Sequence, residues 1–227
     1  VRRLFRAALG LCDRYYLLAW LCGRHKIMRN RARYSREWLF RRCREVEANP
    51  DGFIDIWARE HWKSSLITFA GSLQEILRDP EITIGIFSHT RPVAKAFLIQ
   101  LKREMEINDE LRACYPDVLW DRPDLQAPKW SENEGLIVKR TGNPKEATIE
   151  AWGLVDGMPT GRHYKLRAYD DVVTRETVTT QEQIAKCNEA FELSDNLGSE
   201  GGRCWIIGTR YHMADPYKTM IDRKVAL

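Results

Sequence analysis

The residues Lys63-Ser64-Ser65 follow a short apolar run and stand at the start of a predicted helix. A Lys and a hydroxyl residue at a strand-to-helix turn end a phosphate-binding loop. In such a loop backbone N–H groups hold phosphates, the Lys reaches the β and γ oxygens, and the Ser binds Mg²⁺. The two glycines of the pattern G-x-x-x-x-G-K-[ST] would fall on Trp57 and Trp62, so the chain lacks both. The alternative interpretation is a surface helix start capped by Ser64.

Two adjacent acids, Asp170 and Asp171, end a second apolar run. Nucleotide hydrolysis needs one carboxylate that holds Mg²⁺ and another that orients or deprotonates the attacking water. Such pairs are also ordinary turn residues. A third run, 204–208, is followed by Thr209, which could sense a γ-phosphate or could belong to a plain turn. The order of the three motifs along the chain favours nucleotide chemistry.

The elements that would position these residues alternate between strand and helix. Strands are predicted at 53–57, 82–88, 135–140, 147–154, 164–169 and 204–208, and helices at 64–77, 91–106 and 181–193. We expect a long irregular connection over 115–134, and a hairpin joining 135–140 to 147–154. This order predicts an α/β domain with a largely parallel central sheet flanked by helices. Ligands of such sheets bind at the carboxyl ends of the strands, where all three motifs lie.

Three segments resemble the large terminase subunit of tailed bacteriophages, the ATPase motor that packages DNA into procapsids. The segments are Ala58-Arg59-Glu60-His61-Trp62-Lys63-Ser64, the stretch from Gly161-Arg162-His163 to Tyr169-Asp170-Asp171, and Gly208-Thr209-Arg210-Tyr211-His212-Met213-Ala214-Asp215-Pro216-Tyr217. The resemblance covers about residues 50–220. It implies a RecA-like ASCE P-loop ATPase that uses ATP and Mg²⁺, with an extra strand between the phosphate-loop strand and the Asp-bearing strand. It also implies a C-terminal nuclease, which would not fit after Tyr217, so we expect the ATPase part of a longer protein.

The resemblance further implies roles for individual residues. Lys63 and Ser64 would hold the phosphates and Mg²⁺, Asp170 would bind the metal, and Asp171 would be the catalytic carboxylate. Thr209 would couple hydrolysis to motion, and Arg59 would lie against the γ-phosphate. The nucleotide-binding loop would comprise Arg59, Glu60, His61, Trp62, Lys63, Ser64 and Ser65.

Packaging motors of this kind work as rings, in which an arginine is delivered to the neighbour's phosphate. The candidates are Arg140, preferred because a hairpin turn can protrude toward a neighbour, and Arg162; the alternative for each is a solvated surface arginine. The implied partners are double-stranded DNA, the portal protein, the small terminase subunit and further copies of the chain. We expect a homo-oligomeric ring when the motor packages DNA, and a monomer when the domain is isolated.

Charge is divided unevenly along the 227 residues. The whole chain has a net charge of +4, but the first 50 residues carry 13 basic and 4 acidic side chains, a net +9, which leaves −5 for the rest. Helical spacing of apolar residues predicts a basic helical arm over 1–50, ahead of the ATPase domain over 51–227. Its close-set arginines are Arg29, Arg31, Arg33, Arg36, Arg41, Arg42 and Arg44.

Two interpretations of this arm stay open. Its arginines could bind the DNA backbone through phosphate contacts without reading bases. Alternatively, the arm packs on the ATPase body and its arginines are solvated or meet acids of an adjacent subunit. In that case Trp20, Tyr34 and Trp38 belong to the core.

Composition excludes several classes of protein. With 44% hydrophobic and 30% charged residues, the chain is neither disordered nor collagen-like. Six scattered cysteines without a Cys-x-x-Cys pair predict reduced, mostly buried thiols, and the histidines at 61, 89, 163 and 212 form no ligand set. The most apolar stretch, 15–22, is too short to span a bilayer, and no signal peptide is evident. We expect a protein of the host cell cytoplasm that works at the procapsid.

Two other functions remain open from the sequence. The chain could be a helicase-like ASCE motor, although no second RecA-like lobe is recognisable in its 227 residues. It could also be a DNA-binding or structural module that kept the fold and lost the activity, which the two missing glycines favour.

Overall fold

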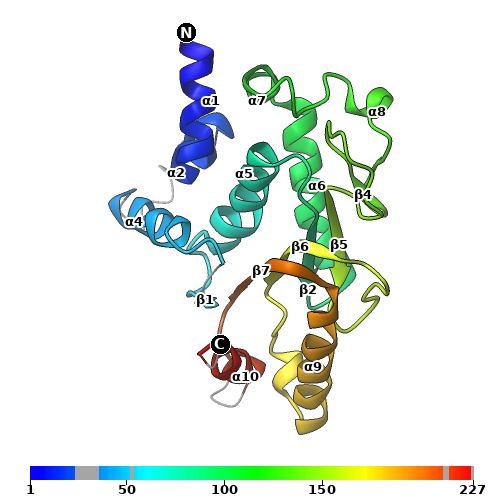
Figure 1. The fold of residues 1–227 in the computed structure, drawn as a ribbon. Helices are drawn as coiled ribbons and strands as arrows, with labels where there is room; N and C mark the ends of the chain where they lie inside the picture. The colour runs from blue at the N-terminus through cyan, green and yellow to red at the C-terminus, as the bar shows by residue number, and fades with distance from the viewer. Residues whose placement is uncertain (24–35, 52–53, 212–214, 226–227) are drawn as a thin grey trace.

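The chain folds around one seven-stranded sheet in the computed structural model, which describes residues 1–23, 36–51, 54–211 and 215–225 (Figure 1). The strands are β1 (Ile54–Ile56), β2 (Ile84–Ser88), β3 (Trp130–Ser131), β4 (Gly135–Leu136), β5 (Ile149–Gly153), β6 (Tyr164–Asp170) and β7 (Gly198–Gly208). The α-helices are α1 (Arg2–Cys12), α2 (Arg14–Tyr16), α4 (Arg36–Glu47), α5 (Ala70–Arg78), α6 (Arg91–Ile107), α7 (Asp109–Cys114), α8 (Pro123–Gln126), α9 (Gln181–Ser194) and α10 (Pro216–Val225). The π-helical segments are η1 (Leu17–Leu21) and η2 (Ser65–Phe69), and the 3₁₀ turns are η3 (Glu176–Val178) and η4 (Asp195–Leu197).

The strands lie in the order β1-β7-β6-β2-β5-β4-β3. The first five of these run parallel, and β4 and β3 are added antiparallel at the β5 edge. The α/β fold with a mostly parallel sheet, predicted from the sequence, is therefore confirmed. In addition, β7 lies between β1 and β6 and so separates the strand before Lys63 from the strand that ends in Asp170.

Strand register brings the carboxyl ends of the central strands to one edge. Ile56 is level with Gly208, and Ile207 is level with Asp170. Phe87, the residue before the end of β2, is level with Tyr169. The segments that follow β1, β7, β6 and β2 therefore leave the sheet side by side.

The predicted hairpin formed only in part. β4 and β5 are antiparallel, but they pair through Leu136 and Ile149 alone, and the chain between them is irregular. The backbone N–H groups of Thr141 and Gly142 donate to the carboxylate of Glu81, at 2.7 and 3.0 Å, instead of to a neighbouring strand. These hydrogen bonds lower the pKa of Glu81 and hold the loop beside the amino end of β2.

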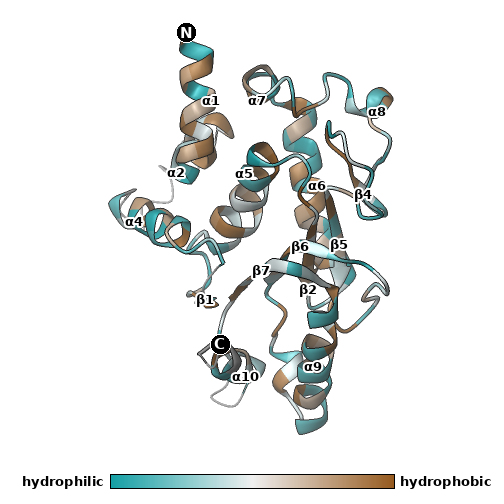
Figure 2. Ribbon diagram, viewed as in Figure 1, coloured by the Kyte–Doolittle hydropathy of each residue, from teal (hydrophilic) through white to brown (hydrophobic). Residues whose placement is uncertain are grey.

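Side chains on the two faces of the sheet enter two different apolar clusters. Ile84, Ile86 and Ile207 point into the cluster formed with α5 and α6, whereas Phe87 and Ile206 point into the cluster formed with α9 and α10. This alternation is what a sheet covered on both faces requires. Figure 1 shows α5 and α6 on one side of the strands and α9 and α10 on the other, and Figure 2 shows hydrophilic colour over much of α9 and α4.

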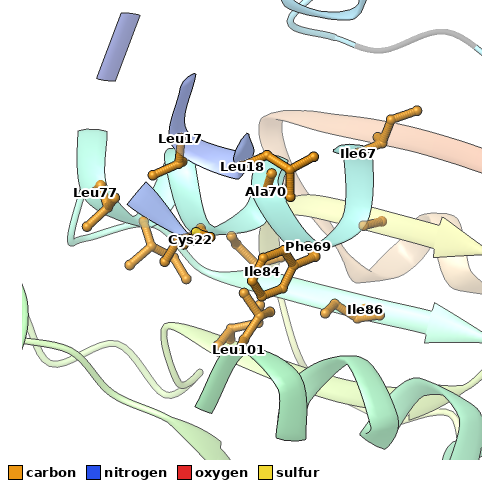
Figure 3. Packing of buried hydrophobic residues seen from close by; sticks show 14 of the residues in the cluster. Leu17, Leu18, Cys22, Ile67, Phe69, Ala70, Leu77, Ile84, Ile86 and Leu101 are labelled. Carbon is orange, nitrogen blue, oxygen red and sulfur yellow. The ribbon is translucent and has the colours of Figure 1, made fainter. Parts of the chain in front are cut away.

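The N-terminal arm packs on the body of the protein. Leu17, Leu18 and Cys22 belong to the same buried cluster as Leu77 of α5 and Ile84 of β2 (Figure 3). Loss of this arm would therefore expose apolar residues of the core. The described part of the arm and the body thus share one continuous core.

The aromatic residues assigned to the core are distributed differently from the prediction. Trp20 is 57% exposed although its neighbours Ala19 and Leu21 are buried, so its assignment to the core was wrong. Trp38 is half-buried and packs edge-on against Trp57 and His61. Tyr34 lies outside the described residues.

The described arginines of α4 pair with acids of their own chain. Arg41 contacts Glu37 at 2.6 Å, Arg42 contacts Glu45 at 2.6 Å, and Arg44 contacts Asp13 at 3.0 Å. Arg29, Arg31, Arg33 and the side chain of Arg36 lie outside the described residues.

All six cysteines are free, as predicted, but only Cys22, Cys43 and Cys187 are buried. Across the described ranges, no helix combines the length and apolar character that crossing a bilayer requires.

Candidate functional site

The site is built at the carboxyl edge of the sheet by segments that follow three neighbouring strands. Residues 57–65 follow β1, Asp171 follows β6, and Thr209 follows β7. Sequence reasoning placed all three segments at this edge, and the strand order brings them next to one another. What each side chain does there depends on its burial and its partners.

Lys63 lies at the first turn of the helix that continues through η2 into α5. The residue is only 7% exposed, and its Nζ donates to Oδ1 of Asp171 at 2.7 Å. A buried ammonium needs a partner because it has lost its hydration. Asp171 supplies that partner while the Asp171 side chain itself stays 43% exposed. The pair is thus buried on its lysine side and open to solvent on its carboxylate side.

Asp170 is completely buried beneath this pair. Oδ1 accepts a hydrogen bond from Ser64 Oγ at 2.9 Å, and Oδ2 accepts one from Thr68 Oγ1. Burial raises the pKa of Asp170 from 3.8 to about 6, against the opposing effects of Thr68, Lys63 and Ser64. The removal of this carboxylate from water therefore outweighs the groups that stabilise its charged form.

Thr68 and Ser88 are members of the site that sequence reasoning missed. Thr68 lies one helical turn after Ser64 and therefore on the same face, a spacing that could have identified it. Ser88 ends β2, and its Oγ donates to the backbone carbonyl of Asp170. Its place at the end of a buried strand was the available signal.

Positive φ recurs at every second residue of the loop before Lys63. Glu60 and Trp62 both have φ of +65°, whereas Arg59 and His61 do not have positive φ. Alternation of right- and left-handed residues turns successive N–H groups toward one concave side, the arrangement called a nest, which binds anions. Trp62 stands where the phosphate-loop pattern has glycine, the residue that adopts this conformation without strain. The left-handed turn is thus present although the glycine is not.

The side chain of Trp62 is half-buried and packs partly against the apolar core. At the other glycine position, the N–H of Trp57 donates to the carbonyl of Gly208 at 3.2 Å, in continuation of the β1–β7 ladder. Both tryptophans are therefore accommodated by neighbouring structure.

A third left-handed residue is Asp171, with φ of +48°. Its N–H donates to the carbonyl of Ile207 at 2.9 Å, so the backbone is still held to β7 while the side chain turns toward Lys63. Aspartate tolerates this conformation better than most residues.

These groups surround a cavity of about 360 Å³. Its lining comprises Arg59, Glu60, His61, Trp62, Lys63, Ser64, Ser65 and Asp171. Every residue of the predicted nucleotide-binding loop thus lines a single cavity, together with the predicted catalytic carboxylate.

Thr209 lies beside this cavity. Its Oγ1 donates to the carbonyl of Trp57 at 3.3 Å, which ties the end of β7 to the start of the loop. Thr209 lines a second cavity of about 420 Å³, and Arg59 lines both cavities. Gly208, just before Thr209, is closely covered, since a Cβ there would lie 1.9 Å from the hydroxyl of Tyr217.

Arg140 and Arg162 lie at the amino ends of the strands, opposite the carboxyl ends that build the site. Arg140 donates to the carbonyl of Glu146 at 2.8 Å, and Arg162 donates to the carbonyl of Lys145 at 2.7 Å. Both carbonyls precede β5, at its amino end. The structure therefore does not bring either arginine to the cavity of its own chain, because the irregular loop before β5 returns to the start of the sheet.

The described histidines have different surroundings, and His89 Nε2 lies 3.9 Å from a carboxylate oxygen of Glu176. His61 Nδ1 lies 2.8 Å from the carbonyl of Arg59, and the N–H of His163 donates to Glu146. His212 lies outside the described residues. Within the described ranges, no group of three or more His, Cys, Asp or Glu side chains is placed to hold a metal.

No protein-family model matches the chain, and no curated protein matches it. The interpretation of the site consequently depends on its own geometry.

Proposed function

We propose that the chain binds ATP with Mg²⁺ and hydrolyses it at the carboxyl edge of the sheet. The observation that carries this proposal is the left-handed loop that ends in Lys63 and Ser64 and faces Asp170 and Asp171. A nest of N–H groups, a helix N-terminus and a lysine together suit phosphate groups.

The residues present also fit Mg²⁺. Ser64 Oγ and Asp170 Oδ1 are 2.9 Å apart, and both are oxygen donors of the kind Mg²⁺ prefers. Mg²⁺ takes one or two carboxylates and fills its remaining positions with water and phosphate, so a larger acidic cluster is not needed. The raised pKa of Asp170 supports the assignment, because a cation at this carboxylate would balance a buried charge. When bound, the metal would neutralise charge on the phosphate oxygens.

The contacts of Lys63 suggest how the site changes when nucleotide binds. In the structure Lys63 is paired with Asp171. A phosphate on the loop would offer Lys63 a second anionic partner and leave Asp171 available to accept a hydrogen bond from water. Asp171 would then orient the attacking water and receive its proton.

We further propose that this ATPase is the motor domain of a terminase large subunit, which moves double-stranded DNA into procapsids in the host cytoplasm. The three motifs that resemble this family meet at one edge, and β7 separates β1 from β6 in the strand order that the resemblance implies. A homo-oligomeric ring, the portal protein and the small terminase subunit are the partners that this proposal requires. In a ring, Arg140 would have to exchange its contact with Glu146 for a neighbour's phosphate.

Mg²⁺-dependent ATP turnover tests the enzymatic part. We expect Lys63→Ala to lower kcat/KM at least about a hundredfold, the order of loss when one preorganised electrostatic contact is removed. The matched control is Lys145→Ala, which removes a lysine bound to the carbonyl of Gly161 at the amino edge and should leave turnover unchanged.

Because a neighbour's arginine completes the site in a ring, turnover of the monomer is expected to be slow. ATP binding should therefore be measured in parallel on the same proteins. Equal binding and equal turnover by wild type and Lys63→Ala would contradict the proposal.

DNA binding by the arm needs a test that leaves the core intact, since deletion of the arm would remove Leu17 and Leu18 from it. We expect the triple substitution of Arg29, Arg31 and Arg33 by Gln to reduce the slope of log K against log salt concentration by about three, close to one unit per lost phosphate contact. The control, Arg41→Gln with Arg42→Gln, changes arginines already paired with Glu37 and Glu45. An unchanged slope in the triple variant would place DNA elsewhere.

A further inference from the structure

Two side chains far apart in the sequence meet between the two cavities. A guanidinium N–H of Arg59 donates to the hydroxyl of Tyr211, and the guanidinium carbon lies 5.3 Å from the centroid of the Tyr211 ring. Arg59 belongs to the loop after β1, and Tyr211 belongs to the segment after β7. The pair thus bridges two of the three segments that build the site.

Hydrogen bonds hold the backbone of Tyr211 and of the residues before it. Its backbone N–H donates at 3.1 Å to the carboxylate of Asp215, a buried residue directly before α10. On the other side, Gly208 and Thr209 are both hydrogen-bonded to the backbone of Trp57. The backbone N–H of Tyr211 and the two residues at 208 and 209 are therefore held by hydrogen bonds to neighbouring structure.

Arg59, by contrast, is exposed and lies on a loop. A long exposed arginine samples many rotamers, and it loses that freedom when it is held in one position. A guanidinium that lies near an aromatic ring and donates one hydrogen bond to its hydroxyl is restricted, yet it keeps most of its five N–H donors available. Since Arg59 lines both cavities, those donors lie at the side of the phosphate cavity nearest Thr209.

We propose that Tyr211 is a positioning residue that holds Arg59 ready for the terminal phosphate of ATP. This inference rests on the proposed function and deepens it, because it assigns the discrimination between ATP and ADP to the Arg59–Tyr211 pair. Phosphates shared by ATP and ADP bind to the loop and Lys63. The γ-phosphate, which ADP lacks, is contacted by Arg59, and Tyr211 holds Arg59 in position for that contact.

Binding of a non-hydrolysable ATP analogue and of ADP, each with Mg²⁺, tests the inference without requiring turnover. Tyr211→Leu should weaken the analogue about tenfold, as expected when a charge-assisted hydrogen bond is lost, and should leave ADP affinity within about twofold. Tyr211→Phe keeps the ring but removes the hydroxyl that accepts from Arg59, so it should weaken the analogue by less than Tyr211→Leu does and should also leave ADP affinity within about twofold. In an Arg59→Ala background, Tyr211→Leu should add no further loss, because the two residues act as one unit.

Equal weakening of both nucleotides by Tyr211→Leu, or a full additional loss in the Arg59→Ala background, would overturn the inference and leave Tyr211 a structural residue. Lys63→Ala separates this failure from that of the proposed function. If Lys63→Ala weakens both nucleotides while Tyr211→Leu changes neither, only the inference is wrong. If Lys63→Ala has no effect on either nucleotide, the proposed function and the inference are both wrong.

Discussion

The amino ends of the parallel strands (the amino edge) and their carboxyl ends (the carboxyl edge) carry the same kinds of charged side chain in different surroundings. At the amino edge, Glu150 is 1% exposed and accepts hydrogen bonds from Tyr164 Oη at 2.5 Å and from the N–H of Ala147 at 2.9 Å. Arg162 lies 3.6 Å from the same carboxylate. These groups satisfy one another within the strands and the loops that start them.

At the carboxyl edge, Asp170 is as deeply buried, but its carboxylate is bound by the hydroxyls of Ser64 and Thr68. Lys63 pairs instead with Asp171, which opens onto a cavity. Under the proposed function, the amino edge serves stability and the carboxyl edge is arranged for a ligand. Natural proteins often keep charged groups whose charge is compensated only by a bound ligand, although such groups lower the stability of the free protein.

The largest expected effect is that of Asp171→Asn on turnover. The amide cannot accept a proton from water, so kcat should fall at least about a hundredfold, within the range that general base catalysis contributes. Affinity for ATP should be kept, because Lys63 remains to bind phosphate. Single-turnover hydrolysis beside ATP titration would measure both, and wild-type turnover in this variant would place the base elsewhere.

A smaller effect, confined to stability, is expected from Glu150→Gln at the amino edge. The two carboxylate oxygens accept from different donors, and a glutamine side chain offers only one oxygen, so one buried donor would face an NH₂ group. We expect a loss of about 2 kcal/mol in unfolding free energy, the usual cost of an unsatisfied buried group. Urea unfolding measures it, with the exposed Glu200→Gln as the control.

ATP affinity per folded molecule should be unchanged in Glu150→Gln. A variant that folds normally but loses nucleotide binding would show that the amino edge also contributes to the site, which would remove the contrast between the two edges.

The smallest effect is expected from Asp170→Asn in the absence of Mg²⁺, which should raise the unfolding free energy instead of lowering it. The pKa of Asp170 is higher in the folded protein than its ordinary value of 3.8, so the ionised carboxylate destabilises the fold above about pH 6, and this cost fades as pH falls toward 3.8. At pH 7 the neutral amide should raise the unfolding free energy by roughly 1 kcal/mol, less than the roughly 3 kcal/mol that the shift alone corresponds to, because Lys63 loses a nearby charge. Unlike the backbone N–H of Ala147 beside Glu150, the hydroxyl of Ser64 or Thr68 can rotate to accept a hydrogen bond from the amide NH₂, so no fixed donor is left facing it. A loss of stability like that of Glu150→Gln would contradict this account.

The convergence of the motifs was predictable from the sequence. Asp170 and Thr209 come directly after apolar runs, Lys63 follows one after a short loop, and parallel strands end at a common edge. The buried hydrogen bond between Ser64 and Asp170 follows from that rule, although the residues are 106 positions apart.

Other features could not be predicted, because they depend on tertiary partners. Arg140 was expected at a protruding turn, but Glu81 binds the following loop and holds it at the amino end of β2. The left-handed conformation of Glu60 and Trp62 contradicts the preference of both residue types, so no local rule would have indicated it. Tyr211 was within a recognised motif, yet only the fold shows that its ring meets Arg59.

The central claim, that residues 59–65 hold phosphate, is tested most directly by a structure of the chain with Mg²⁺ and a non-hydrolysable ATP analogue. The account predicts phosphate oxygens at hydrogen-bonding distance, about 3 Å, from the N–H groups of Trp62, Lys63 and Ser64. It also predicts the metal beside Ser64 and Asp170. A nucleotide bound elsewhere, with the Lys63–Asp171 pair intact and no phosphate on the loop, would contradict it.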